Sequence, residues 1–284
     1  MSAPPPIQWY PGHIAKAEKQ LKEQLRKVDV VLEVLDARIP MASHHPQIDS
    51  WIGEKPRIVV LNRVDMIPET LKQDWVKWFK LQKKQPLFSN AKQGKGVKAI
   101  KAAAQQAGVA MNQRRRDRGM RPRPVRAVVI GFPNVGKSAL INRLVGKKIV
   151  ASERRAGVTR QLRWVKISQE IELLDAPGII PWRLENQDDA VKLAICEDIG
   201  QASYDNQLVA AAAVDLLVDL GFEEPLKSRF QLDPLEMTGE VFIQTASDRL
   251  YQGDKERVAR QILYDFRTGN LGAIPLELPP NNEQ

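Results

Sequence analysis

Apolar residues recur in short β-branched runs along the first part of the chain, and each run is long enough for one buried strand. The runs are DVVLEVLDA (29–37), RIVVLN (57–62), QPLFSN (85–90), VRAVVIGF (125–132), QLRWVKI (161–167) and IELLDAPG (171–178). Nearly continuous apolar runs of this length are typical of strands that are covered on both faces. The pattern therefore predicts a largely parallel, buried sheet.

Helical periodicity fills the intervals between these runs. Apolar residues at spacings of three and four mark residues 14–28, 69–82 and 96–113, and a further helix is expected from Lys137. Strands that alternate with helices predict an α/β domain with helices on both faces of the sheet. Ligands of such domains bind at the carboxyl ends of the strands.

The pattern changes at about Asp188, where the β-branched runs stop. Three amphipathic segments follow: DDAVKLAICEDI, QLVAAAAVDLLVDL and GDKERVARQILYDFRTG. We therefore expect two domains, an α/β domain over residues 1–184 and a small all-α domain over residues 185–284. The proline-rich end, IPLELPPNNEQ, is predicted to be a short tail.

Charge divides the chain at the same place. Residues 1–184 hold 35 basic against 15 acidic residues, a net charge of +20, whereas residues 185–284 hold 8 against 19, a net charge of −11. A basic body of this size is typical of a protein that binds a polyanion, most simply nucleic acid. Solubility alone is the other interpretation of the excess charge.

The single cysteine, Cys196, excludes an intramolecular disulfide and a cysteine-based metal cluster. The amino-terminal residues lack the pattern of a secretory signal, and no stretch approaches the roughly 20 apolar residues that span a bilayer. We therefore expect a soluble, cytoplasmic protein that makes no membrane contact and is a monomer.

The segment GFPNVGKS (131–138) fits the phosphate-loop pattern G-x-x-x-x-G-K-[ST] and lies between a predicted strand and a predicted helix. Its backbone amides can bind phosphate oxygens, and the helix N-terminus favours negative charge. Lys137 would bridge the β and γ phosphates, and Ser138 would bind Mg²⁺. The predicted nucleotide contacts here are Val135, Gly136, Lys137, Ser138 and Ala139.

Two further segments fit the same chemistry. DAPG (175–178) ends a strand, where Asp175 can hold Mg²⁺ and the amide of Gly178 can reach the γ phosphate. Thr159 lies between this segment and the phosphate loop, and its hydroxyl would complete the Mg²⁺ shell only while the γ phosphate is present. A turn or helix cap is the other interpretation of Thr159.

NRVD (62–65) ends a predicted strand 69 positions before the phosphate loop. Asp65 could accept hydrogen bonds from guanine N1–H and N2–H₂, and Asn62 could tie loops together. Such a site rejects adenine, because the carboxylate would be left unpaired. Arg63 stands where lysine is usual in this motif, and its planar head can also stack on a base. The N-R-x-D pattern is common, so this motif alone does not exclude a chance match.

The order of these motifs resembles that of circularly permuted GTPases, in which the base motif and the SNAK loop (89–92) precede the phosphate loop. WYPGHIAKA (9–17) and LDARIPMASHHP (35–46) narrow the resemblance to the YlqF/RbgA family of ribosome biogenesis GTPases, and with FRTGNLG (266–272) it covers nearly the whole chain. It implies a permuted GTPase domain, with motif order G4-G5-G1-G2-G3, followed by a small helical domain.

The resemblance implies a GTP-hydrolysing factor in late assembly of the large ribosomal subunit, with GTP or GDP and Mg²⁺ as ligands and rRNA as a partner. Asn62, Arg63 and Asp65 would then contact guanine, supported by the loop residues Ser89, Asn90 and Ala91. Asn134 is a candidate K⁺ ligand, or a brace of the loop. The helical domain would touch RNA through Lys255, Arg257 and Arg260, or would bind a ribosomal protein.

Catalysis is the least determined part of the site. Ile179 follows DAPG, where many GTPases have a glutamine that orients the attacking water. His13 is the family candidate for that role, although it could instead fasten the amino-terminal segment. We expect weak intrinsic hydrolysis that the ribosome stimulates. The alternative is an rRNA-binding assembly factor in which the nucleotide only sets conformation.

The permutation requires a new connection, which falls on MNQRRRDRGMRPRPVR (111–126). Its seven arginines and one aspartate cannot be packed in a core, so they are expected at the surface. There they could contact phosphates, each contact making binding more sensitive to salt. A solvated linker is the other interpretation.

Overall fold

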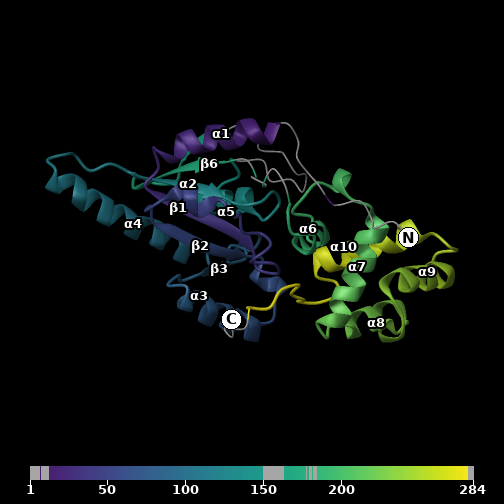
Figure 1. Cartoon of the computed structure of the whole chain (residues 1–284). Coiled ribbons are helices and arrows are strands. Elements are labelled where there is room, and N and C mark those ends of the chain that lie inside the picture. The colour runs from purple at the N-terminus through teal and green to yellow at the C-terminus, as the bar shows by residue number, and fades with distance from the viewer. Residues whose placement is uncertain are drawn as a thin grey trace.

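The computed structural model describes residues 7, 13–149, 163–176, 178, 181 and 184–280. Within them, one six-stranded sheet is followed by a group of helices (Figure 1). Each apolar run of the sequence contains one strand. The strands are β1 (Val30–Asp36), β2 (Arg57–Asn62), β3 (Leu87–Ser89), β4 (Val125–Ile130), β5 (Arg163–Lys166) and β6 (Ile171–Asp175).

The strand order is β3-β2-β1-β4-β6-β5, and all neighbours are parallel except β5 and β6. The predicted, largely parallel sheet is therefore confirmed. In the register, Asp36 of β1 lies opposite Asn62 of β2, which lies opposite Ser89 of β3. Residues that are far apart in the sequence thus end their strands at one edge of the sheet.

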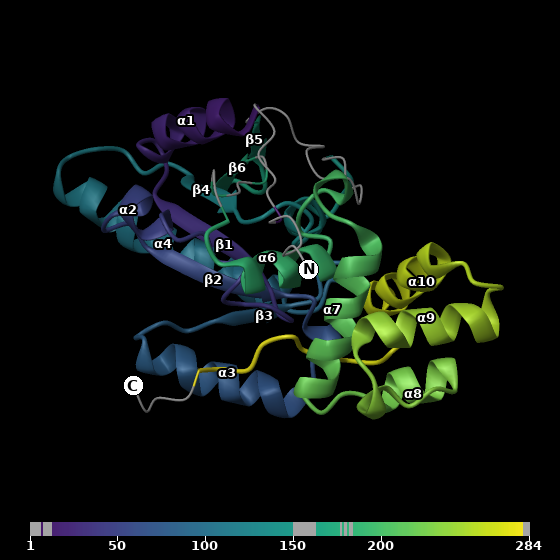
Figure 2. The same ribbon diagram turned by 45° about the vertical axis from the view of Figure 1, so that its right-hand side comes forward.

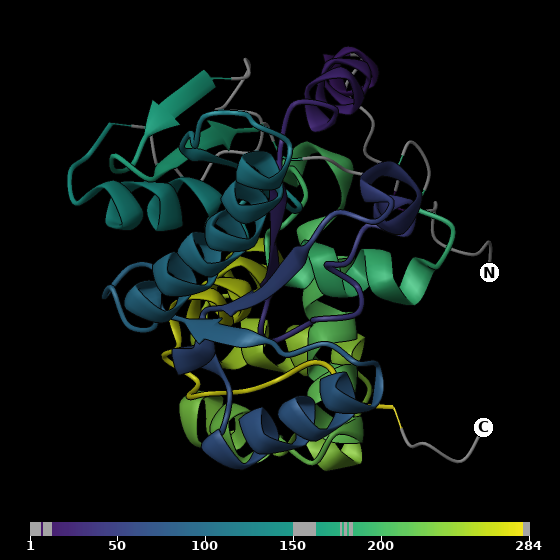
Figure 3. The ribbon, with the colours of Figure 1, turned by 90° about the vertical axis from the view of Figure 1, so that its left-hand side faces the viewer.

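Helices cover both faces of the sheet (Figure 3). Val31 and Val128 pack with α1 and α2 on one face, whereas Leu32 and Val129 point to the other face, which carries α4 and α5. Successive residues of a strand point to opposite faces of the sheet, so these strands are buried on both sides. The helical elements of this part are α1 (His13–Leu25), α2 (Ile48–Ile52), the 3₁₀ turn η1 (Val64–Met66), α3 (Glu69–Leu81), α4 (Val97–Asp117) and α5 (Lys137–Val145).

Helix α4 is longer than its apolar periodicity predicts. The expected helix ends near residue 113, but α4 continues to Asp117 and takes in the first part of the arginine-rich connection. Its end projects beyond the sheet in Figure 1. Its last turn holds Arg114, Arg115 and Arg116, and basic side chains there interact favourably with the helix dipole.

The helical region, residues 187–280, follows the sheet. Four of its α-helices begin at side-chain caps, because Asn186, Asp205, Thr238 and Asp254 accept hydrogen bonds from backbone amides of the first turn. The elements are α6 (Gln187–Ile195), η2 (Gln201–Ser203), α7 (Asn206–Asp219), α8 (Glu224–Phe230), η3 (Pro234–Glu236), α9 (Gly239–Leu250) and α10 (Lys255–Thr268).

One hydrophobic cluster joins the sheet to the helical region. It contains Val34 of β1 and Val135 of the phosphate loop together with Ile195 of α6 and Phe266 of α10. Burial of this continuous apolar surface holds the two parts together. The domain boundary at residue 184 remains a prediction.

The chain after α10 returns to the sheet (Figures 1 and 2). The amides of Leu276 and Glu277 donate hydrogen bonds to the carbonyl oxygen of Arg38, at 3.0 and 3.1 Å, and Ile274 and Leu276 are buried. The first residues of the segment that its prolines suggested to be a tail therefore form part of the packed structure.

Candidate functional site

Asn62 joins three loops at the carboxyl edge of the sheet. Its Nδ2 donates to the carbonyl oxygen of Val135 in the phosphate loop at 2.8 Å. Its Oδ1 accepts from Ser89 Oγ and from the amide of Ala91, both at 3.0 Å. Asn62 is 3% exposed, so these contacts satisfy a buried amide. The structure thus brings NRVD, the SNAK loop and GFPNVGKS into one site.

The SNAK loop is fixed from two further sides. Arg143 of α5 donates to the carbonyl oxygens of Ala91 and Lys92. The Oδ1 of Asn90 accepts from the amide of Gln93 at 2.9 Å. The backbone of this loop is therefore held in place by the helix that follows the phosphate loop.

Asp65 and Arg63 lie on either side of Val64 but face different surroundings. Asp65 is exposed in η1, where its carboxylate is accessible to a ligand. Arg63 has a positive φ of 62° and points back into the molecule. Its Nη1 lies 2.7 Å from Asp36 Oδ2, and its Nη2 donates to the carbonyl oxygen of Asn134 at 2.6 Å. The arginine therefore binds the phosphate loop.

Two glycines shape the phosphate loop. Gly131 has φ 149°, and a Cβ there would lie 2.2 Å from the carbonyl oxygen of Val34. Gly136 has φ 101° and precedes α5, and a Cβ there would lie 2.2 Å from Asn62 Nδ2. A side chain at either position would displace the backbone that is needed to approach a phosphate. The loop therefore fits the cradle that its motif predicts.

Lys137 is buried beneath this loop. Its Nζ donates to the carbonyl oxygens of Phe132 and Gly131, at 2.7 and 3.1 Å. Burial lowers the pKa of Lys137 to about 8, although the charges of Asp175 and Asp198 act to raise it. A bound phosphate would favour the charged amine.

The predicted Mg²⁺ ligands lie on neighbouring elements. Asp175 is 2% exposed at the end of β6, and Ser138 is half-buried in the first turn of α5. Hydroxyl and carboxylate oxygens, completed by phosphate and water, are the ligands that Mg²⁺ prefers. A Cβ on Gly178 would lie 2.7 Å from Pro133, so this glycine packs directly against the phosphate loop. The candidate residues thus fit a Mg²⁺–nucleotide complex.

Several predicted residues are placed only in part. Thr159 and Ile179 lie outside the described residues, as does the side chain of His13, which begins α1. Asn134 has φ 57°, and its Nδ2 donates to the carbonyl oxygen of Glu197 at 2.7 Å. Its side chain therefore contacts the helical region as well as standing at the predicted K⁺ position.

A buried ionic cluster beside the site was not predicted from the sequence. Asp36, Arg38 and Asp198 are each 0% exposed. Arg38 donates to Asp36 Oδ1 from Nε at 3.0 Å and to Oδ2 from Nη2 at 2.7 Å. Burial acts to raise the pKa of Asp36, but Arg38 and Arg63 lower it to about 2. The segment LDARIP contains Asp36 and Arg38, but no local signal in it indicates their burial or their link to the helical region.

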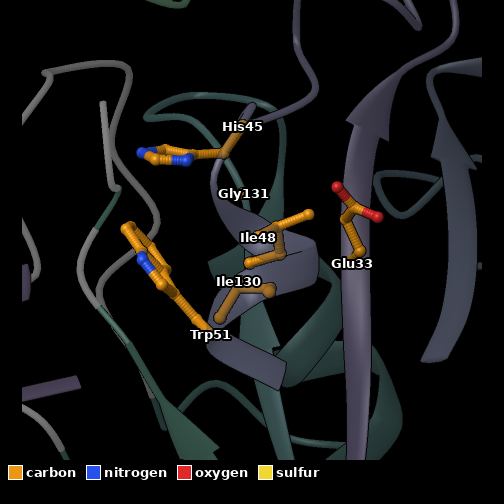
Figure 4. Close-up of a pocket in the computed structure, with 6 residues that line it drawn as sticks. All are labelled: Glu33, His45, Ile48, Trp51, Ile130 and Gly131. Atoms are coloured by element: carbon orange, nitrogen blue, oxygen red, sulfur yellow. The ribbon is translucent and has the colours of Figure 1, made fainter. Parts of the chain in front are cut away.

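A small cavity of about 10 Å³ lies next to the phosphate loop (Figure 4). It is lined by Glu33, His45, Ile48, Trp51, Ile130 and Gly131. The rings of His45 and Trp51 lie 4.4 Å apart. A cavity of this size holds one water molecule at most, so it is no nucleotide site.

The fold and the site define a circularly permuted P-loop GTPase, because base motif, supporting loop and phosphate loop meet at one sheet edge in permuted order. A family profile described as "50S ribosome-binding GTPase" matches residues 126–227. The chain is similar to Ribosome biogenesis GTPase A of Priestia megaterium, with 39% identity over 98% of this chain and 99% of the relative. It therefore belongs to the ribosome biogenesis GTPase A family.

Further comparisons agree with this assignment. The Bacillus cereus relative of the same name is 38% identical over 96% of this chain and 94% of its own. A crystal structure of GNP-bound YlqF from T. maritima superposes with a TM-score of 0.64 at 26% identity, covering 94% of this chain and 99% of that one. The chain is thus a GTPase, and guanine nucleotide and Mg²⁺ are the ligands that its family implies.

Proposed function

We propose that this GTPase acts in late assembly of the large ribosomal subunit, binding precursor particles in its GTP state and leaving after hydrolysis. The contact between Asn62 and Val135 carries the nucleotide part of the proposal, because it makes one site of the base motif and the phosphate loop. The names of the relatives support the ribosomal part. Hydrolysis by the free protein is weak and is stimulated by the ribosome.

The proposed roles follow the geometry of the site. Asp65 reads guanine, Lys137 and the loop amides bind the phosphates, and Gly178 senses the γ phosphate. Ser138, Asp175 and Thr159 hold Mg²⁺, and Asn134 is the proposed K⁺ ligand. His13 positions the attacking water. The GTPase domain covers residues 1–184, and the helical domain covers residues 185–284.

The arginine-rich connection is the proposed contact with rRNA. Two of its arginines are already in ion pairs with acidic side chains of the protein. Arg123 is clamped by Asp29 at 2.7 and 2.9 Å, and Arg126 lies 3.4 Å from Glu172. The other arginines of the connection form no ion pair within the part of the chain that the structure describes. They are Arg114, Arg115, Arg116, Arg118 and Arg121.

The helical region offers a second, smaller RNA contact. A cavity of about 790 Å³ beside α10 is lined by Arg257 and Arg260 among other polar residues. Arg260 is already paired with Glu256 at 2.7 Å, so its charge is partly neutralised. A ribosomal protein is therefore the other partner that this acidic region could take. No helix among the described residues has the length and apolar character to cross a membrane, and the proposed location is the cytoplasm.

The test is co-sedimentation of the purified protein with large-subunit precursors in GTP, GDP or a non-hydrolysable GTP analogue. We expect retention with the analogue, release with GTP as it is hydrolysed, and little binding with GDP. Equal binding in all three states would contradict the proposal. If binding depends on the nucleotide but release does not require hydrolysis, the result would favour the alternative in which the nucleotide only sets conformation. That alternative is supported by Ile179, which stands where many GTPases have the glutamine that orients water.

A further inference from the structure

Three residues with positive φ form a continuous chain of hydrogen bonds from the guanine motif to the helical region. Arg63 (φ 62°), Asn134 (φ 57°) and Glu197 (φ 63°) come from the base motif, the phosphate loop and the turn after α6. Arg63 donates to the carbonyl of Asn134, and Asn134 Nδ2 donates to the carbonyl of Glu197. Non-glycine residues rarely adopt this conformation, and such strain is retained where the surroundings impose it.

A second path leads from Arg63 to the same turn. Arg63 contacts Asp36, Asp36 binds Arg38 with both carboxylate oxygens, and Arg38 Nη2 donates to the carbonyl oxygen of Cys196 at 3.3 Å. The guanidinium of Arg38 also lies 5.2 Å from the ring centre of Phe266 in α10. Both paths therefore end on consecutive residues, Cys196 and Glu197.

The third residue of that turn faces Arg63 directly. Asp198 Oδ1 lies 3.8 Å from Arg63 Nη2, and Asp198 is 0% exposed. Neither of its carboxylate oxygens has a hydrogen-bond partner among the described residues. A buried carboxyl group without hydrogen-bond partners is costly, so its environment is sensitive to any movement of the arginine.

Arg267 links the turn at residues 196–198 to α10. Arg267 donates to the carbonyl oxygens of Ile195 and Ala194, both at 2.8 Å, and so satisfies the carboxyl end of α6. A displacement of the turn would break these contacts or carry α10 with it.

Arginine is required at position 63 for this arrangement. Its planar head offers separate nitrogens to Asp36 and to the phosphate loop, 2.7 and 2.6 Å away. A lysine has one ammonium group, which serves as a point charge and lacks the fixed fork. The arginine that replaces the usual lysine of the motif thus reaches two partners at once.

The geometry points to Arg63 as a positioning residue that couples occupancy of the guanine site to the docking of the helical region, through the turn at Cys196, Glu197 and Asp198. This inference rests on the guanine site of the proposed function and is independent of any ribosomal role. Nucleotide in the site fixes the two loops that Arg63 joins and so stabilises the docked helical region. Without the two contacts of the Arg63 guanidinium, nucleotide binding would no longer affect the docking of the helical region.

Cys196 provides the test, because it is the single cysteine of the chain, is 1% exposed and lies in the coupled turn. The rate at which a thiol reagent labels Cys196 is measured without nucleotide and with saturating GDP and a GTP analogue, whose binding is confirmed by fluorescence titration. In the wild-type protein we expect nucleotide to slow labelling by about fivefold or more, the usual lower range for coupling between sites.

The variant Arg63→Lys retains a positive charge but not the fork. We expect it to be labelled faster than wild type in the absence of nucleotide and at a rate that nucleotide changes by less than about twofold, which corresponds to nearly complete loss of coupling. The matched control is Arg123→Lys. Arg123 clamps Asp29 with two nitrogens and is 27% exposed, against 28% for Arg63. The control should keep the wild-type ratio of rates.

Each outcome decides a separate point. Wild-type protein that binds GDP but is labelled at the same rate with and without it would overturn the coupling and leave the proposed function intact. Wild-type protein that binds no guanine nucleotide would overturn both. Arg63→Lys with the wild-type ratio would show that the fork is dispensable and overturn the inference. If this variant does not fold by circular dichroism, Arg63→Gln is measured in the same way, and the wild-type ratio in that variant would overturn the inference.

Discussion

Asp65, the proposed reader of guanine, is exposed in η1. Replacing it with asparagine exchanges an acceptor for an amide that can donate to the C2 carbonyl of xanthine. We expect Asp65→Asn to lower GDP affinity by about a hundredfold or more, because guanine donors lose their partner. The affinity for xanthosine diphosphate should rise, as measured by competition titration.

The control for this change is Asp74→Asn, on the exposed face of α3. It removes the same charge at a site that does not contact the nucleotide, and base preference should stay that of wild type. If Asp65→Asn also kept the wild-type preference, another group would have to read the base.

Lys137, the proposed phosphate ligand, should make nucleotide binding depend on pH. Its pKa of about 8 means that roughly half of the free protein carries a neutral amine at pH 8, whereas bound phosphate favours the charged form. Binding of GDP should therefore take up about half a proton at pH 8 and less than about 0.2 at pH 7. Burial and the charge of Asp36 raise the pKa of Asp198 to about 8 as well. A bound nucleotide anion would raise this pKa further, so Asp198 would also take up protons on binding.

Proton uptake is obtained from calorimetric titrations in two buffers that differ in ionisation enthalpy. The apparent binding enthalpy should differ between buffers at pH 8 and converge at pH 7. Identical enthalpies at pH 8 would show that Lys137 is fully charged before the nucleotide arrives.

Single residues also mark how far the sequence could predict the site. Asn62 meets the phosphate loop as expected, because its motif ends a parallel strand and such ends share an edge. Asp36, Arg38 and Asp198 could not be found, since Arg38 meets Cys196 across 158 positions and no local pattern encodes that separation. Charged residues are rarely buried, so composition gives no reason to place these three in the core.

Among the elements, α4 and the connection after it carry five arginines that form no ion pair within the described part of the chain. Three neutralising changes, Arg114→Gln, Arg116→Gln and Arg118→Gln, should weaken binding to rRNA. The slope of log affinity against log salt should become shallower by about two to three, which corresponds to about 0.7 to 0.9 for each lost phosphate contact. Filter binding at several KCl concentrations measures this slope.

The matched control removes three exposed charges from α3 and the turn that follows it, by changing Lys77, Lys80 and Lys83 to glutamine. It should leave the salt dependence close to that of wild type. Equal effects of the two triple variants would mean that only net charge attracts the RNA.

Element boundaries show the limits of periodicity. The strand runs and α3 were found because their apolar pattern persists through the whole element. Helix α2 has five residues, too few for a period of 3.6 to be read. Helix α4 continues past its last buried residue, Met111, because its arginines are good helix formers that need no core contact.

At the scale of the whole molecule, Glu277 fastens the end of the chain to the sheet. Its carboxylate accepts from the amides of Met41 and Ala42, at 2.7 and 3.1 Å, and from Lys192 at 3.2 Å. Glu277→Ala should lower the free energy of unfolding by about 2–4 kcal/mol, since a buried amide and a lysine lose their acceptor. Urea unfolding measures this value.

Leu278→Ala is the control in the same segment, because Leu278 is 52% exposed. Its effect should stay within about 0.5 kcal/mol, as for most surface changes. Equal losses for the two variants would mean that the segment contributes by apolar contact and not through the carboxylate of Glu277.

The position of β1 has a consequence for biosynthesis. This strand pairs with β2 on one side and with β4 on the other, so both of its edges are covered only after residue 130 has been translated. Until then, a nascent chain with β1, β2 and β3 in place would present Val30 to Glu33 as an open edge, which invites pairing with other chains. A fragment that stops at the end of α4 should therefore aggregate during refolding, and the permuted gene order makes completion of the second half of the sheet a requirement for solubility.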